Sequence, residues 1–98
     1  MNDIHPEELK QRIKKGEKLT LIDVRESWEF EEVNIGAKPF PLYDLPQQLE
    51  KLNFLKETEI IVHCQSGKRS GQAKKFLQQH GFMKVRSLHG GLNAYLQD

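Results

Sequence analysis

The chain has 98 residues, of which 30% are charged and 37% hydrophobic, and its formal net charge is +1 at pH 7. This balance indicates one globular domain over residues 1–98. The small net charge does not favour nucleic acid or a membrane surface as a partner. Every apolar run is shorter than the roughly 18 residues that are needed to cross a bilayer. Because the N-terminus lacks the pattern of a signal peptide and the single cysteine cannot form an internal disulfide, we expect a cytoplasmic protein.

Helix-like and strand-like segments alternate along the chain. Apolar periodicity, caps and prolines predict helices over residues 3–16, 27–33 with Ser27 as the cap, 44–52, 67–80 and a last stretch after Gly91. A nearly continuous apolar run predicts a strand covered on both faces over residues 19–24, a second buried strand is predicted over residues 60–63, and a third strand over residues 85–88. The alternation predicts an α/β fold in which helices flank both faces of a mainly parallel central sheet.

Polar or glycine-rich segments follow the three predicted strands. They are Asp23–Arg25, Cys64–Ser70 and His89–Gly91. Ligands of parallel sheets bind beyond the carboxyl ends of the strands, so we expect these segments to lie close together. Asp23 and Arg25 fit a catalytic or loop-supporting pair, but we favour the alternative of a hydrogen-bonded cap and a structural ion pair.

Cys64 lies where a strand turns into a helix, which makes it the main candidate for a catalytic residue. A thiolate is the nucleophile, and the N–H groups at a helix N-terminus favour such an anion. The loop that would bind the anion consists of Gln65, Ser66, Gly67, Lys68, Arg69 and Ser70. Lys68 and Arg69 carry the wrong sign for a helix start unless an anion occupies the loop, and Arg69 could hold it with two parallel hydrogen bonds. The alternative is a cysteine that is only a small buried apolar residue.

The remaining candidates point away from catalysis or metal binding. His63 precedes Cys64 in a strand, so its side chain should face the opposite side, which argues against a general base. No other histidine has a metal-ligand spacing with Cys64, so we expect no metal ion and no cofactor. Trp28 and Phe30 are expected to pack in the core or at its rim.

Three segments together resemble the signatures of the rhodanese family of sulfurtransferases. They are Leu21–Glu26 (LIDVRE) with Glu29 and Phe30, Cys64–Ser70 (CQSGKRS), and Leu88–Leu92 (LHGGL) before Tyr95. In order and spacing they resemble the family nearly end to end. Around Asn34–Leu42 the chain departs from the commoner pattern and is closer to rhodanese domains appended to adenylating enzymes of sulfur-carrier pathways. Tyr95 replaces a frequent tryptophan.

The resemblance implies both a fold and a mechanism. The fold would be a parallel sheet of about five strands flanked by helices. The Cys64 thiolate would take the outer sulfur of a small anionic donor such as thiosulfate, and the resulting persulfide would pass it to cyanide, a small thiol or a protein. The loop amides would stabilise the persulfide, and Lys68 and Arg69 would attract the donor.

Three other functions are weighed against this one. Phosphatases and arsenate reductases of the same fold need one residue more than the four that separate Cys64 from Arg69, so they are disfavoured. A sulfur-relay module, which would receive sulfur from a partner protein and show little free turnover, would use the same Cys64. A structural domain with an idle cysteine is disfavoured because the loop residues also fit the function.

Overall fold

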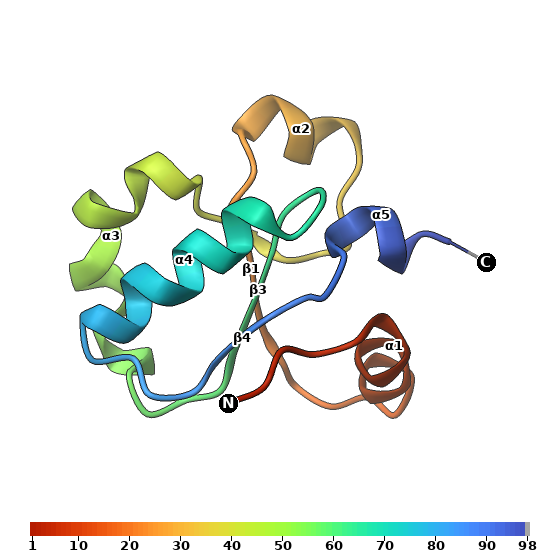
Figure 1. The fold of residues 1–98 in the computed structure, drawn as a ribbon, viewed down its shortest axis with the longest axis horizontal. Helices are drawn as coiled ribbons and strands as arrows, with labels where there is room; N and C mark the ends of the chain where they lie inside the picture. The colour runs from red at the N-terminus through yellow and green to blue at the C-terminus, as the bar shows by residue number, and fades with distance from the viewer. Residues whose placement is uncertain (98) are drawn as a thin grey trace.

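The computed structural model describes residues 1–97 (Figure 1). Its helices are α1 (Pro6–Lys14), α2 (Ser27–Glu32), α3 (Leu45–Leu52), α4 (Lys68–Gln79) and α5 (Gly91–Tyr95). Its strands are β1 (Thr20–Asp23), β2 (Lys38–Pro39), β3 (Ile60–His63) and β4 (Val85–Ser87), and two short 3-10 helices, η1 (Leu42–Asp44) and η2 (Asn53–Leu55), flank α3. The expected elements are present with ends shifted by a few residues, whereas the pattern missed the very short β2.

The strands form one parallel sheet in the order β2-β1-β3-β4. In the register of β1 and β3, Thr20 lies opposite Ile60 and Asp23 lies opposite His63. Because both strands end at the same level, their carboxyl ends open at one edge of the sheet. The predicted α/β fold with a parallel sheet is therefore confirmed.

The sheet of residues 1–97 has four strands, one fewer than the five or so that were expected. A fifth position exists beside β4, where Ile4 makes an isolated parallel bridge to Leu88. The Ile4 amide donates to the Ser87 carbonyl at 3.0 Å, and the His89 amide donates to the Ile4 carbonyl at 2.8 Å. Pro6 starts α1 two residues later, so the extended segment is too short to become a strand.

The core is divided between the two faces of the sheet. Ile60 and Val62 pack on one face with Leu45 and Leu77 of α3 and α4, whereas Ile61 packs on the other with Leu9 of α1. Figure 1 shows the same division, with α3 and α4 on one side of the strands and α1 and α5 on the other. Since adjacent strand residues point to opposite faces, a strand covered on both sides must be apolar throughout, as predicted.

Two local expectations about α2 are wrong. The N-cap is Glu26 and not Ser27, because the Glu26 amide donates to the Glu29 carboxylate at 3.1 Å in a capping box. Trp28, expected with Phe30 in the core or at its rim, is 62% exposed and lies outside the core, whereas Phe30 is partly buried. In the part of the chain that the structure describes, no helix has the length and apolar character needed to cross a membrane.

Replacing Leu77 tests the packing of α4 against the sheet. Leu77→Ala removes a fully buried side chain and should lower the free energy of unfolding by about 2–5 kcal/mol in urea titrations. The neighbouring Gln78 is exposed, so Gln78→Ala should change it by no more than about 0.5 kcal/mol. Equal losses in the two variants would contradict this packing.

Candidate active site

The three segments expected at the carboxyl edge of the sheet do lie together (Figure 1). The Val24 amide donates to the His63 carbonyl at 3.0 Å, which joins the end of β1 to the end of β3. The amides of Leu92 and Asn93, at the start of α5, donate to the carbonyls of Cys64 and Gln65 at 2.9 Å each. The N-terminal amides of α5 thus bind the backbone carbonyls at the start of the loop that follows Cys64.

Cys64 lies at the centre of this arrangement, with only 1% of its surface exposed. The Gly67 amide donates to its Sγ at 3.0 Å, and the Ser70 hydroxyl lies 3.5 Å from the same sulfur. Burial raises the pKa of the Cys64 thiol, but hydrogen bonds from the Ser70 side chain and from the amides of Ser70, Gly67 and Ser66 outweigh burial and lower the pKa below its ordinary value. The site therefore favours a sulfur anion although the cysteine is buried.

The backbone at Gly67 makes this geometry attainable. Gly67 has a φ of +104°, in the left-handed region that side chains disfavour, and it directly precedes the first residue of α4. Gly71, by contrast, has no positive φ and lies within α4. The bend of the loop thus depends on the first of these two glycines.

Ser70 is itself held by a hydrogen-bond chain. Its hydroxyl donates to the Gly67 carbonyl at 3.2 Å and lies 2.7 Å from the hydroxyl of Ser87, at the end of β4. The hydroxyl has a single donor proton, so Ser70 accepts from the Cys64 thiol while it donates to Gly67, and it can donate to the thiolate only when that proton turns from the Gly67 carbonyl to Sγ.

Asp23 and Arg25 form a buried ion pair that supports the loop. The Arg25 guanidinium donates to both carboxylate oxygens of Asp23, at distances of 2.8 to 3.1 Å. It also donates to the Gln65 side-chain oxygen at 3.1 Å and to the Val33 carbonyl at 2.6 Å. Arg25 therefore ties together β1, the cysteine loop and the end of α2.

His63 lies beneath the loop and is fully buried. Its Nε2 is 3.6 Å from the Asp23 carboxylate and has no hydrogen-bond partner within residues 1–97, while its Nδ1 lies 3.3 Å from the Cys64 carbonyl. Burial lowers the pKa of His63, which favours the neutral ring. These contacts give His63 a structural place under the loop and not that of a base acting on Sγ.

The two loop cations differ in their surroundings. The guanidinium of Arg69 donates to both oxygens of Glu29 at 2.6 and 3.0 Å, and these hydrogen bonds lower the pKa of Glu29 to about 2. Hydrogen bonding to Glu29 raises the pKa of Arg69, and a weaker attraction to Cys64 acts in the same direction. Lys68 is exposed and has no ion pair within the described residues. The guanidinium of Arg69, which was expected to hold an anion, thus binds Glu29 of α2 instead. Of the two loop cations, only Lys68 has no ion pair among the described residues.

The sequence placed His89–Gly91 near the cysteine loop, but it did not reveal how Gly91 and Asn93 position that loop. An ideal Cβ on Gly91, whose φ is +62°, would lie 2.6 Å from the Gln65 carbonyl oxygen and 2.8 Å from that of Cys64. Asn93 accepts a hydrogen bond from the Gln65 side chain at 2.6 Å. The paired glycines at 90–91 were the available signal, since a glycine often marks a close approach of two backbones.

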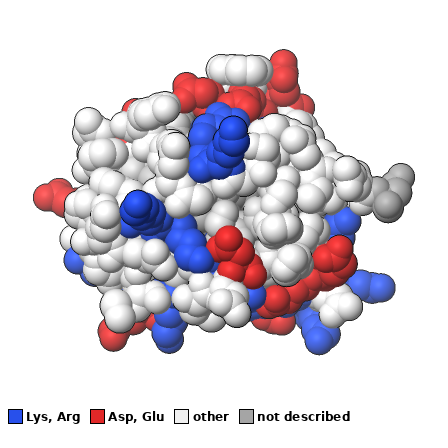
Figure 2. Space-filling view, viewed as in Figure 1, with Lys and Arg blue, Asp and Glu red and all other residues white. Residues whose placement is uncertain are grey.

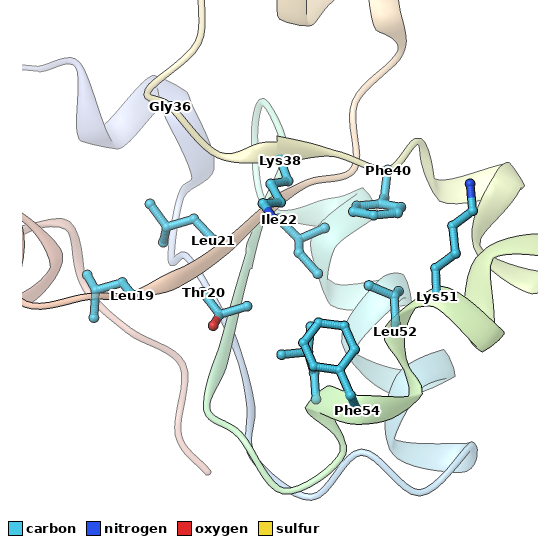
Figure 3. A pocket seen from close by; sticks show the side chains of 11 residues that line it. Leu19, Thr20, Leu21, Ile22, Gly36, Lys38, Phe40, Lys51, Leu52 and Phe54 are labelled. Carbon is cyan, nitrogen blue, oxygen red and sulfur yellow. The ribbon is translucent and has the colours of Figure 1, made fainter.

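Two of the hollows on the surface of residues 1–97 differ in their relation to Cys64. A shallow one of about 320 Å³ adjoins the loop and is lined in part by Gly67, Lys68 and His89. The other, of about 350 Å³, lies between β1, β2 and the α3–η2 segment and is lined mainly by apolar side chains (Figure 3). The second hollow contains no residue of the cysteine loop. Residues 1–97 include no group of three or more His, Cys, Asp or Glu residues that could hold a metal ion.

Comparison with known proteins gives the family. The rhodanese-like domain matches residues 5–98. The chain belongs to the rhodanese-like domain family. A rhodanese-like domain protein from Staphylococcus aureus superposes with a TM-score of 0.88 at 26% identity, covering 100% of this chain and 94% of that one.

Relatives of this rhodanese-like domain bear names that refer to sulfur transfer. It is 36% identical over 99 residues to the putative sulfurtransferase YtwF of Bacillus subtilis, covering 97% of this chain and 90% of the relative. It is 32% identical over 96 residues to a sulfurtransferase of Allochromatium vinosum, covering 97% and 88%. These relatives support a sulfur-transfer role.

An adenylating enzyme is also among the relatives, as expected from the sequence around residues 34–42. The domain is 35% identical over 95 residues to the probable adenylyltransferase/sulfurtransferase MoeZ of Mycobacterium tuberculosis. The match covers 94% of this chain but only 24% of MoeZ. The likeness is therefore to an appended domain and not to the whole enzyme.

Replacing Gly91 should displace the cysteine loop. In Gly91→Ala the new methyl group would press on two loop carbonyls, so the variant should lose stability and alkylate more slowly at Cys64. Gly36→Ala is the control, because Gly36 has a φ of +87° but nothing within 4 Å of its ideal Cβ. It should lose only the cost of the backbone conformation, about 1–2 kcal/mol, and leave alkylation unchanged. Equal behaviour of the two variants would contradict a role for Gly91 in loop placement.

Replacing Ser70 should raise the pKa of the Cys64 thiol. Ser70→Ala removes a hydrogen bond that favours the thiolate, so the rise of iodoacetamide alkylation with pH should move to higher pH, and the rate at pH 7 should fall several-fold. Ser66→Ala makes the same chemical change in the loop but keeps the amide that acts on Sγ. Its profile should match the unmodified protein, and a matching profile in Ser70→Ala would refute the role of this hydroxyl.

Proposed function

We propose that this rhodanese-like domain transfers sulfane sulfur through a persulfide on Cys64. The observation that carries the proposal is the environment of the Cys64 sulfur. Sγ accepts a hydrogen bond from the Gly67 amide at 3.0 Å, and the pKa of the thiol lies below its ordinary value although the residue is buried. The sulfurtransferase names of the relatives support the same role.

The first half-reaction loads the cysteine. The Cys64 thiolate attacks the outer sulfur of a donor such as thiosulfate, the sulfur–sulfur bond of the donor breaks, and sulfite leaves with the bonding electron pair. Lys68, exposed and unpaired among the described residues, attracts the anionic donor. The terminal sulfur of the persulfide is an anion, which suits a loop whose N–H groups and α4 N-terminus face inward.

The second half-reaction unloads it. A nucleophile such as cyanide, or the thiolate of a small molecule or protein, attacks the terminal sulfur and the Cys64 thiolate leaves. Splitting the transfer into two displacements at one residue is covalent catalysis, which gives ping-pong kinetics. Cys64 must be a reduced thiol before it is loaded and again after it is unloaded, and the cytoplasm keeps thiols reduced.

Phosphoryl transfer is the competing chemistry for this fold, and the loop fits it poorly. Four residues separate Cys64 from Arg69, and the Arg69 fork is occupied by Glu29 instead of facing an oxyanion. The support for sulfur over phosphate is thus both the length of the loop and the direction of its arginine.

Intact mass measurement tests the proposal. After incubation with thiosulfate and desalting, the protein should gain the mass of one sulfur atom, and cyanide should remove it because the persulfide sulfur is electrophilic. Cys64→Ser should gain nothing. Absence of the gain in the unmodified protein, or hydrolysis of a chromogenic phosphate ester without sulfur uptake, would overturn the proposal.

A further inference from the structure

One face of α2 combines an exposed tryptophan with uncompensated acidic charge. Trp28, Glu31 and Glu32 are spaced at i, i+3 and i+4, so they lie on the same side of the helix. Trp28 is 62% exposed, both glutamates are exposed, and the following Val33 is 44% exposed. These four residues are called the α2 surface below.

The charge of the α2 surface is not neutralised within the domain. The ion pairs among residues 1–97 include Glu29 but neither Glu31 nor Glu32. Figure 2 shows acidic side chains gathered at the top of the molecule, where Figure 1 places α2. A negative field around an exposed indole is suited to lysine or arginine side chains, which carboxylates attract and the indole face binds.

The α2 surface lies on a helix that is bound to the cysteine loop. Glu29, next to Trp28 in the helix, is bound by Arg69 of the loop at 2.6 Å. The carbonyl of Val33 is bound by Arg25, which also binds Gln65 beside Cys64. A partner that covers the α2 surface is therefore held against elements that are directly tied to the cysteine loop.

The burial of Cys64 makes such a contact useful. Because only 1% of Cys64 is exposed, an acceptor thiol must be brought to the loop in a defined position. Tryptophan is enriched among the residues that contribute most of the binding energy at protein interfaces. Complementary charge on two proteins speeds their association. The α2 surface combines an exposed tryptophan with negative charge that is unpaired within residues 1–97, on a helix that is bound to the cysteine loop.

We propose that the α2 surface docks a partner protein whose basic surface carries the thiol that exchanges sulfur with Cys64. This rests on the proposed function. In the exchange the partner's thiolate attacks the terminal sulfur of the Cys64 persulfide, a new sulfur–sulfur bond forms on the partner, and the old bond breaks with its electron pair returning to Cys64. The persulfide moves without any net oxidation, so no further reactant is needed.

Two synthetic cysteine peptides of equal length test the docking. Both carry one cysteine and one leucine, flanked by lysine and arginine in the basic peptide and by glutamate in the acidic one. The protein is first loaded with thiosulfate, desalted and checked by mass, and the loss of sulfur to each peptide is then timed. The basic peptide should accept sulfur about tenfold faster at low ionic strength, with the advantage shrinking as salt is added.

Variants separate docking from the peptides' own thiol reactivity. In Glu31→Lys/Glu32→Lys the ratio of basic to acidic rates should fall to about one or below, and Trp28→Ala should reduce the rate with the basic peptide several-fold. Glu50→Lys/Glu57→Lys, an equal charge reversal at exposed positions outside α2, should keep the ratio of the unmodified protein. Cyanide should unload every variant at the same rate. An unchanged ratio in Glu31→Lys/Glu32→Lys would overturn the docking proposal.

A binding measurement keeps the two proposals distinguishable. Trp28 is the only tryptophan of the chain, so its fluorescence reports contact at the α2 surface directly. Basic peptides with serine in place of cysteine should change this emission at lower concentration than acidic ones, and the preference should disappear in Glu31→Lys/Glu32→Lys. If no sulfur is loaded from thiosulfate but the preference is seen, the proposed function fails and docking stands. If sulfur is loaded but no preference is seen, only docking fails.

Discussion

The buried ion pair between Asp23 and Arg25 is the interaction on which the arrangement of the site depends. Two charges can be kept out of water only when their hydrogen bonds are satisfied, and removing one partner of such a pair costs about 3–5 kcal/mol. Here the guanidinium binds the Asp23 carboxylate, the Gln65 side chain and the Val33 carbonyl. One side chain thus joins the end of a central strand to the cysteine loop and to α2.

The loop resolves a conflict between burial and charge. Burial alone would keep Cys64 protonated, and a protonated thiol is a poor nucleophile. Hydrogen-bond donors of Ser70, Gly67 and Ser66 outweigh this effect of burial, so the pKa of the Cys64 thiol is lowered and not raised. Those donors are fixed because α5 holds the loop carbonyls from behind and Ser87 holds Ser70. Backbone and hydroxyl groups therefore favour an anion at this position, while Arg69 is bound to Glu29 and Lys68 is exposed at the edge of the loop.

The charge on α2 serves two ends. Glu29 faces the loop and neutralises Arg69, which fixes α2 against the start of α4. Glu31 and Glu32 lie on the face that carries Trp28 and remain available to solvent or to a partner. A short helix thus separates an inner acidic contact, which supports the site, from an outer acidic surface, which suits recognition. The shallow hollow beside Lys68 and His89 leaves the other side of the loop open to small anions.

The sequence by itself determined the α/β class, the parallel sheet, the family and the position of Cys64. Each of these depends on local signals: apolar runs such as Ile60–Val62, the glycine before α4, and three motifs in order. Only the tertiary structure decided that Ile4 forms a bridge instead of a fifth strand, that Arg69 binds Glu29, that Gly91 touches the loop and that Trp28 is exposed. The physical reason is that these outcomes depend on which distant segments meet. Residues 29 and 69 carry no mark of their partner. The strand order places residue 91 near residue 65, but it does not fix which atoms touch. Burial of a side chain on a short helix depends on what the rest of the chain leaves uncovered.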